Sequence, residues 1–259
     1  MRVKQSVCIP MMKPQGMSLD DFVGLAAEIG FPAVEIWRLD ESFEDLMDLC
    51  RRHGLTLACM SGCDSMRRGL NDEGEHDRLE AELRESIDIA ARHRIPGLIC
   101  LSGRKRQGVG DEEAAEITAR GLRRIAPYAE EKGVNLNLEL LNTKIDHPGH
   151  QADSTAFGVD VCRRVGSARV RLLYDIYHMG IMEGDVIRTI RQHIRWIGHF
   201  HTAGNPGRRD MDDEQELNYA GICRAIADAD YPWYVGHELR PKGDLIEGLR
   251  RAFATCDQG

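Results

Sequence analysis

Hydrophobic and polar residues alternate along the chain in two distinct patterns. Short apolar runs that end in polar residues have the length and residue types of buried β-strands. Eight such runs cover residues 4–10, 33–37, 55–62, 96–103, 133–142, 170–178, 195–203 and 233–239. Between them lie segments with the apolar spacing of amphipathic helices, among them 19–30, 43–54, 77–94 and 111–133. The pattern therefore predicts strands and helices in alternation.

Several predicted helices end in a glycine just before the next strand, at Gly30, Gly54 and Gly133, as helix C-termini often do. Eight strand–helix units in about 250 residues are what a (β/α)₈ barrel requires. A doubly wound sheet is the alternative, but it often carries a glycine-rich phosphate loop after its first strand. Here the first strand is followed by PMMKPQGMSLDD, which contains no GxGxxG. Since no linker or composition break is visible, we predict an α/β fold with residues 1–259 as a single TIM-barrel domain.

Composition narrows the class of protein. A net charge of −8 and a pI near 5.7 argue against a surface that neutralises nucleic-acid phosphates. No apolar run reaches the roughly 20 residues that span a bilayer, and the first residues lack the apolar core of a signal peptide. The eight cysteines are scattered, with only Cys59 and Cys63 close together. We therefore expect reduced thiols in a cytoplasmic protein without nucleic-acid or membrane partners.

The polar residues at the strand ends are candidate active-site residues, because active sites of a TIM barrel lie at the carboxyl ends of the strands. Side chains alternate along a strand, so parity selects the residues that share the barrel mouth. The last inward residues of four consecutive strands are Glu139, Asp175, His201 and Glu238. A single strand-end acid is more often a helix cap or a salt-bridge partner. Three acids and one histidine at the ends of four successive strands, all on one parity, favour a metal site, because one divalent cation offsets the repulsion of three carboxylates.

The ligand set of three oxygens and one nitrogen suits one Mg²⁺, Mn²⁺ or Co²⁺ ion, with Zn²⁺ as a further candidate. Two other strand ends leave alternatives open. Glu35 and Trp37 have inward parity and fit either a pocket wall or a packed tryptophan with a buried salt bridge. His199 lies one inward layer below His201, where a supporting or core role is more common than metal ligation.

The second half of the chain resembles the hydroxypyruvate isomerase branch of the xylose isomerase-like TIM barrel superfamily. The motifs that carry the resemblance are LELLN (138–142), DIYHMGIMEGD (175–185), IGHFHTAGNPGRRD (197–210), ELNY (216–219) and GHELRP (236–241). The resemblance implies a metal held by the four strand-end residues named above. It also implies that His178 and Arg208 reach the substrate.

These residues predict the isomerisation of a small keto or aldehyde acid, or of a sugar, through an enediolate. Glu139 and Glu238 would exchange protons with the substrate carbons. His178 would hydrogen-bond a substrate oxygen, and Arg208 would neutralise a carboxylate or hold a hydroxyl group. A helix cap is the alternative role for His178. For Arg208 the alternatives are a solvated loop residue, or its neighbour Arg209 in the same role.

Other functions stay open at this point. Hydroxypyruvate isomerases carry an amide side chain where this chain has His201, whereas ketose epimerases carry histidine, so a ketose 3-epimerase is an alternative. A lyase or dehydratase acting on a keto-sugar, an inositol or a glycoside is another, and a non-catalytic sugar-binding protein is a third. DNA-repair endonucleases of the superfamily need histidines where this chain has LACMSGC, LICLSGR and RRDMDD. None of these segments contains a histidine, which argues against that function. We expect a small-molecule substrate, and a homo-oligomer is compatible with the sequence.

Overall fold

The computed structural model describes residues 3–258 and confirms the predicted barrel. Eight parallel strands follow one another in chain order around a closed barrel. They are β1 (Lys4–Cys8), β2 (Ala33–Glu35), β3 (Thr56–Ser61), β4 (Gly97–Cys100), β5 (Asn135–Glu139), β6 (Val170–Asp175), β7 (Ile197–Thr202) and β8 (Tyr234–His237). Each strand lies inside one of the eight predicted apolar runs, because those runs have the composition of a strand that is buried on both faces.

Helices connect the strands, as a parallel sheet requires. They are α1 (Ile9–Met12), α2 (Leu19–Ile29), α3 (Phe43–His53), α4 (His76–His93), α5 (Asp111–Lys132), α6 (Thr155–Val165), α7 (Ile176–Met182), α8 (Val186–His193), α9 (Tyr219–Ala227) and α10 (Leu245–Cys256). Short 3₁₀ turns at Glu73–Glu75 and Ile194–Trp196 precede α4 and β7.

The predicted glycine stops are confirmed. Gly30, Gly54 and Gly133 follow α2, α3 and α5 in the left-handed conformation, with φ of 110°, 71° and 75°. Glycine adopts this conformation without the steric penalty that a Cβ atom brings. At the end of α4 the same conformation falls on Arg94, with φ of 59°. The sequence offers no glycine at that position.

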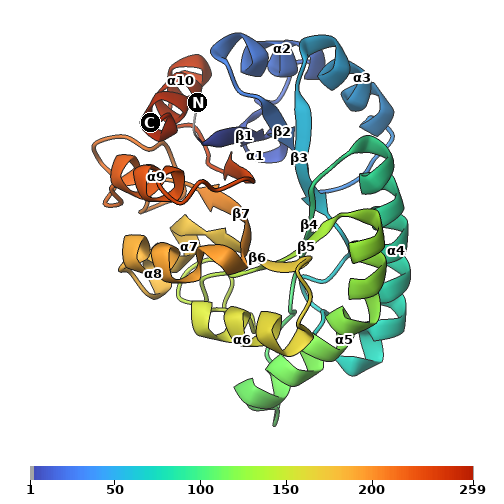
Figure 1. The fold of residues 1–259 in the computed structure, drawn as a ribbon. Helices are drawn as coiled ribbons and strands as arrows, with labels where there is room; N and C mark the ends of the chain where they lie inside the picture. The colour runs from blue at the N-terminus through green and yellow to red at the C-terminus, as the bar shows by residue number, and fades with distance from the viewer. Residues whose placement is uncertain (1–2, 259) are drawn as a thin grey trace. The chain divides into compact units, whose positions relative to one another are not determined.

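The described residues fall into two compact units. One comprises the chain up to Met60 together with Asp185–Ile194 and the part from Phe200 onward. In it β1 pairs with β2 and β8, and α2 packs against α3 and α10; Figure 1 draws α2 and α3 in blue. The apolar face of α2 supplies Phe22, Val23 and Ala26 to the core.

The other unit comprises Ser61–Gly184 and Arg195–His199. Here β5 pairs in register with β4 and β6, and α5 lies beside α4 and α6 (Figure 1). Every residue of β5 is buried. The expectation of a single domain over the whole chain stays a prediction.

Two further properties follow from the described residues. All eight cysteines are unbridged, and all are buried apart from the partly exposed Cys63. Among the helices of residues 3–258, none is long and apolar enough to cross a membrane.

Candidate active site

The end of β6 positions an acid and an imidazole together. Asp175 is the last residue of the strand and also the N-cap of α7, because its side chain accepts a hydrogen bond from the backbone N–H of His178 at 3.1 Å. Such a cap satisfies a backbone donor that has no partner within the helix. It holds the ring of His178 with Nε2 3.5 Å from Asp175 Oδ2. The helix cap is thus made by Asp175, and His178 is the residue that the cap positions.

Asn142 fixes the orientation of the His178 ring. The backbone N–H groups of Ile145 and Asp146 donate to Asn142 Oδ1, at 3.0 and 2.9 Å. The amide nitrogen of Asn142 therefore faces Asp146 Oδ2 and His178 Nδ1, each at 2.6 Å. Since an amide nitrogen only donates, Nδ1 accepts and the ring hydrogen of His178 lies on Nε2. We did not predict this role for Asn142, although its place directly after a strand was a usable signal.

Glu139 ends β5 on the parity that the alternation predicted. The residue two positions earlier, Asn137, packs its amide nitrogen against Gly97 on the neighbouring strand, where a Cβ atom would lie 2.4 Å away. Glu139 pairs in register with Leu173 of β6, two residues before Asp175. Glu139 and Asp175 are both buried.

His201 and Glu238 meet at the ends of β7 and β8. In the ladder His201 pairs with Gly236, and the N–H of Glu238 donates to Thr202 O at 3.0 Å. This bond continues the ladder one residue beyond the end of β8, so Glu238 keeps the predicted register. His201 Nδ1 and Glu238 Oε2 are 3.1 Å apart, and both side chains are almost fully buried.

Three side chains hold the carboxylate of Glu238 in its ionised form. Trp37 Nε1 donates to Oε1 at 2.7 Å, and Arg208 Nη2 donates to Oε2. Burial by itself raises the pKa of Glu238, but the charges of His201 and Arg208 and these hydrogen bonds lower this pKa to about 2. Trp37, which the sequence left as either a pocket wall or a packed side chain, therefore contacts Glu238, a partner that was not predicted.

A tight loop after β7 presents Arg208. Gly204 and Arg209 exchange two backbone hydrogen bonds across it, at 2.7 and 3.1 Å, and Arg240 N donates to Arg208 O at 2.9 Å. Arg208 itself has φ of 56°, a conformation that non-glycine residues adopt rarely and often at functional sites. Its side chain is only 15% exposed, so it is not a solvated surface residue. Arg209 Nη2 instead donates to the backbone of Pro241 at 3.3 Å.

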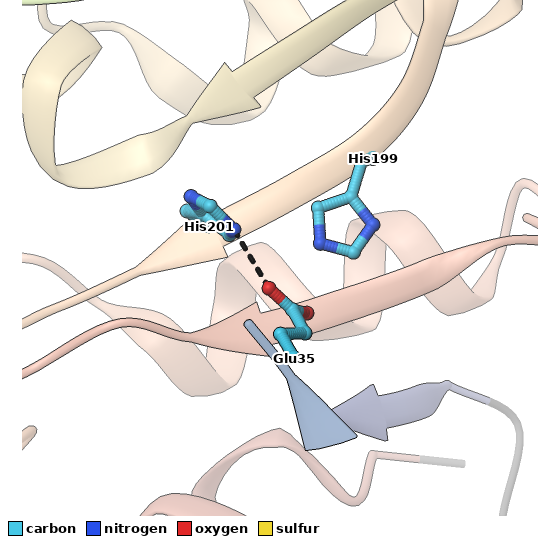
Figure 2. Close-up of side chains that lie close together, drawn as sticks. All are labelled: Glu35, His199 and His201. Atoms are coloured by element: carbon cyan, nitrogen blue, oxygen red, sulfur yellow. Dashed lines mark hydrogen bonds and ion pairs between the residues drawn. The ribbon is translucent and has the colours of Figure 1, made fainter. Parts of the chain in front are cut away.

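Glu35 contacts the other ring nitrogen of His201. Its Oε2 lies 3.0 Å from His201 Nε2 (Figure 2), and its Oε1 accepts a hydrogen bond from Ser6 Oγ. All three side chains are buried. Of the two interpretations that the sequence allowed for Glu35, the buried ion pair is the one found. The part of Ser6 was not predicted.

The described residues contain two groups of acidic and histidine side chains that could hold a metal ion, each with ligand atoms within 4.8 Å of one another. They are Glu35, His199 and His201, and Glu139, Asp175, His201 and Glu238. The second group is the set of predicted strand ends. Three buried carboxylates beside one imidazole carry excess negative charge, which is costly to bury without a cation. The donor chemistry of this group thus fits a divalent ion.

A family model described as Xylose isomerase-like TIM barrel matches residues 23–256. A 2-oxo-tetronate isomerase of Cupriavidus necator is 30% identical over 259 residues, covering 93% of this chain and 94% of that protein. A hydroxypyruvate isomerase of Escherichia coli is 31% identical over 175 residues, covering 66% and 67%. Among solved structures, an AP endonuclease, family 2, from Brucella melitensis superposes with a TM-score of 0.82 over 99% of this chain and 100% of that one. At 24% identity this likeness shows the fold alone.

Proposed function

Because the chain belongs to the xylose isomerase-like TIM barrel family, we propose that it is an isomerase that interconverts a small keto acid and its aldehyde isomer. The names of the relatives from Cupriavidus necator and Escherichia coli support an isomerase of this substrate class. The observation that carries the proposal is the grouping of Glu139, Asp175, His201 and Glu238.

The proposal includes one divalent cation, held by these four side chains. Mn²⁺, Mg²⁺ and Co²⁺ fit three carboxylate oxygens and one imidazole nitrogen, and Zn²⁺ is the next candidate. When bound, the cation would supply Lewis-acid stabilisation of the negative charge that develops on the substrate oxygens.

Glu139 and Glu238 are the proposed proton carriers. In the first step a C–H bond next to the carbonyl group breaks, its electron pair forms the C=C bond of an enediolate, the π pair of the carbonyl group moves onto its oxygen, and a carboxylate accepts the proton. In the second step a carboxylic acid returns a proton to the former carbonyl carbon, and the C=C electron pair forms that C–H bond. The hydroxyl hydrogen of the other carbon passes to the former carbonyl oxygen, and that other carbon becomes the new carbonyl carbon. Glu238 is ionised at neutral pH in its present surroundings, as a proton acceptor must be.

Arg208 and His178 are the proposed substrate contacts. A keto acid brings a carboxylate, and a guanidinium group binds it with two parallel charge-assisted hydrogen bonds. Arg208 already donates to one carboxylate, that of Glu238, so its fork is directed into the site. His178 carries its ring hydrogen on Nε2, on the side of Asp175, where it would donate to a substrate oxygen.

A proton-exchange assay tests the proposed function. Metal-loaded protein is incubated in D₂O with hydroxypyruvate and with ketoses of three to six carbons, and deuterium incorporation is followed by NMR. Glu139→Gln and Glu238→Gln should each abolish exchange. Glu75→Gln is the matched control, because Glu75 is also buried but pairs with Arg68 and Arg78, neither of which is a proposed ligand or substrate contact. A glutamine variant that keeps more than about a tenth of the exchange rate, a barrier change below ~1.4 kcal/mol, would exclude that glutamate as an essential proton carrier.

A ketose 3-epimerase is the second candidate, and His201 is the observation that favours it. Ketose epimerases of the superfamily carry a histidine at this position, whereas hydroxypyruvate isomerases carry an amide side chain. The same assay separates the two. Deuterium at C3 of a ketose together with an epimeric product, and no exchange with hydroxypyruvate, would identify the epimerase.

The remaining expectations accompany this proposal as predictions. They are a cytoplasmic location, a small-molecule substrate with no nucleic-acid partner, a homo-oligomer as one candidate assembly, and a single domain. Light scattering of the purified protein measures the oligomeric state directly.

A further inference from the structure

Glu35 is a buried acid beside His201 to which the proposed reaction gives no role. Its two oxygens are both engaged, Oε1 by the hydroxyl of Ser6 and Oε2 by His201 Nε2 at 3.0 Å. Only 1% of the surface of Glu35 is exposed. Burying a carboxylate this completely costs free energy unless the carboxylate is paired and hydrogen-bonded, as it is here. Figure 2 shows the side chain of Glu35 directed at the ring of His201.

The strands around Glu35 are built to accommodate it. Gly236 of β8 lies beside its carboxylate, and a Cβ atom at Gly236 would meet Glu35 Oε1 at 2.2 Å. The same glycine pairs in register with Ser6 on one side and with His201 on the other. The two partners of Glu35 thus flank the position where a side chain is missing, and the carboxylate fills that space.

The contact with Glu35 assigns one ring hydrogen of His201 to Nε2. A carboxylate only accepts, so His201 Nε2 carries the hydrogen that is donated to Glu35. His201 Nδ1 faces a second carboxylate, that of Glu238 at 3.1 Å, so without metal both ring nitrogens can carry a hydrogen. A cation bound at Nδ1 would displace the hydrogen there and use the Nδ1 lone pair, whereas the hydrogen donated to Glu35 would stay on Nε2. A metal ligand needs that lone pair, and a hydrogen bond from the other ring nitrogen to a carboxylate makes it a better donor.

We propose that Glu35 is a positioning residue that holds His201 as the Nε2–H tautomer and thereby presents Nδ1 to the divalent cation. Ser6 and Gly236 would be the supports of this arrangement, one through its hydroxyl donor and the other through its missing side chain. The inference rests on the proposed function, because it assumes that His201 is a metal ligand.

The test compares Mn²⁺ affinity by calorimetry in metal-stripped wild type, Glu35→Met, Glu35→Gln and Ser6→Ala. Glu35→Met removes the acceptor and should weaken Mn²⁺ binding by roughly 10- to 100-fold, the range seen for outer partners of metal ligands. Glu35→Gln keeps an acceptor without the charge and should fall between Glu35→Met and wild type. Ser6→Ala leaves the carboxylate in place and should show the smallest loss. Glu75→Gln serves as the control and should bind Mn²⁺ as wild type does.

A second readout reports the tautomer itself. In Zn²⁺-loaded protein labelled with ¹⁵N-histidine, long-range ¹H–¹⁵N correlations should assign His201 as protonated on Nε2 and not on Nδ1. Gly236→Ala, which displaces the carboxylate, should alter this pattern and weaken Mn²⁺ binding. It provides a separate route to the same result if Glu35→Met does not fold.

Several outcomes would overturn the proposal. One is a Glu35→Met protein that binds Mn²⁺ within about threefold of wild type, a change below ~0.7 kcal/mol. Another is a His201 protonated on Nδ1 in the loaded protein. A third is a second equivalent of metal in wild type that the Glu35 variants lose, since Glu35 would then be a ligand. A wild-type protein that binds no divalent metal would instead overturn the proposed function together with this inference.

Discussion

Substitution of Asp175 offers a test in which the sign of the stability change should depend on the metal. The side chain has two functions in our account, as the N-cap of α7 and as one of the proposed ligands. Asparagine caps a helix about as well as aspartate, whereas alanine at an N-cap costs about 1 kcal/mol. Asp175→Asn therefore removes the charge and keeps the cap, and Asp175→Ala removes both.

The magnitude follows from the spacing of the carboxylates. Glu139 and Asp175 offer oxygens within 4.8 Å of each other. At an effective dielectric constant of 20, two negative charges at that separation repel by about 3.5 kcal/mol. Without metal, Asp175→Asn should thus be as stable as wild type or more stable, by up to about 3 kcal/mol. Asp175→Ala should be about 1 kcal/mol less stable than Asp175→Asn in every condition.

Metal shifts the comparison in favour of wild type. A cation at 100 times its dissociation constant stabilises the native state by about 2.7 kcal/mol, which is roughly 5–10 °C in Tm for a chain of this size. Wild type should gain this stability, and Asp175→Asn should gain little of it, because one anionic ligand is missing.

Urea denaturation with EDTA and with Mn²⁺ measures both arms for the three proteins. Equal stabilisation of wild type and Asp175→Asn by Mn²⁺ would refute the assignment of Asp175 as a ligand. A metal-free Asp175→Asn protein that is clearly less stable than wild type would refute the repulsion argument.

Three further predictions concern other parts of the molecule. Arg208→Met should raise KM for a keto acid roughly 10- to 100-fold without changing metal content, and Arg208→Lys should recover part of this loss. Arg209→Met should leave KM unchanged, because Arg209 contacts the backbone of Pro241. Unchanged kinetics in Arg208→Met would show that Arg208 is not part of the site. Burial, followed by the nearby His147 and His178, lowers the pKa of His150 to about 3. The unfolded chain therefore binds more protons below pH 6.5, and stability should fall by about 2 kcal/mol from pH 7.5 to 5 on account of His150; a His150→Gln variant with the same pH dependence of its urea midpoint would contradict this. Gly133→Ala should lose about 1 kcal/mol because φ is 75° there. Gly243→Ala is the control and should be neutral or stabilising, because φ of Gly243 lies outside the left-handed region and an added Cβ atom would meet nothing within 4 Å; equal unfolding free energies of the two variants would contradict the backbone argument.

The fold of this chain could be predicted from the sequence because each element is specified locally. Apolar runs define the strands, amphipathic spacing defines the helices, and glycines such as Gly30 mark where helices end. Alternation along a strand also fixes parity, which is why Glu139, Asp175, His201 and Glu238 could be selected from the sequence alone. The helix cap that Asp175 makes with His178 is likewise a local feature, because the two residues are only three positions apart in the chain.

Contacts between distant strands were decided only by the tertiary structure. Glu35 and His201 are 166 positions apart in the chain, and Trp37 and Glu238 are 201 apart. Parity indicated that Glu35 and Trp37 face inward, but it could not choose between a pocket wall and a buried ion pair. That choice depends on the stagger between strands and on the space left by Gly236, which arise only when the sheet is assembled. Which of the two neighbouring arginines contacts Glu238 was likewise visible only in the structure. Arg208, with φ of 56°, donates to Glu238, and Arg209 donates to the backbone of Pro241.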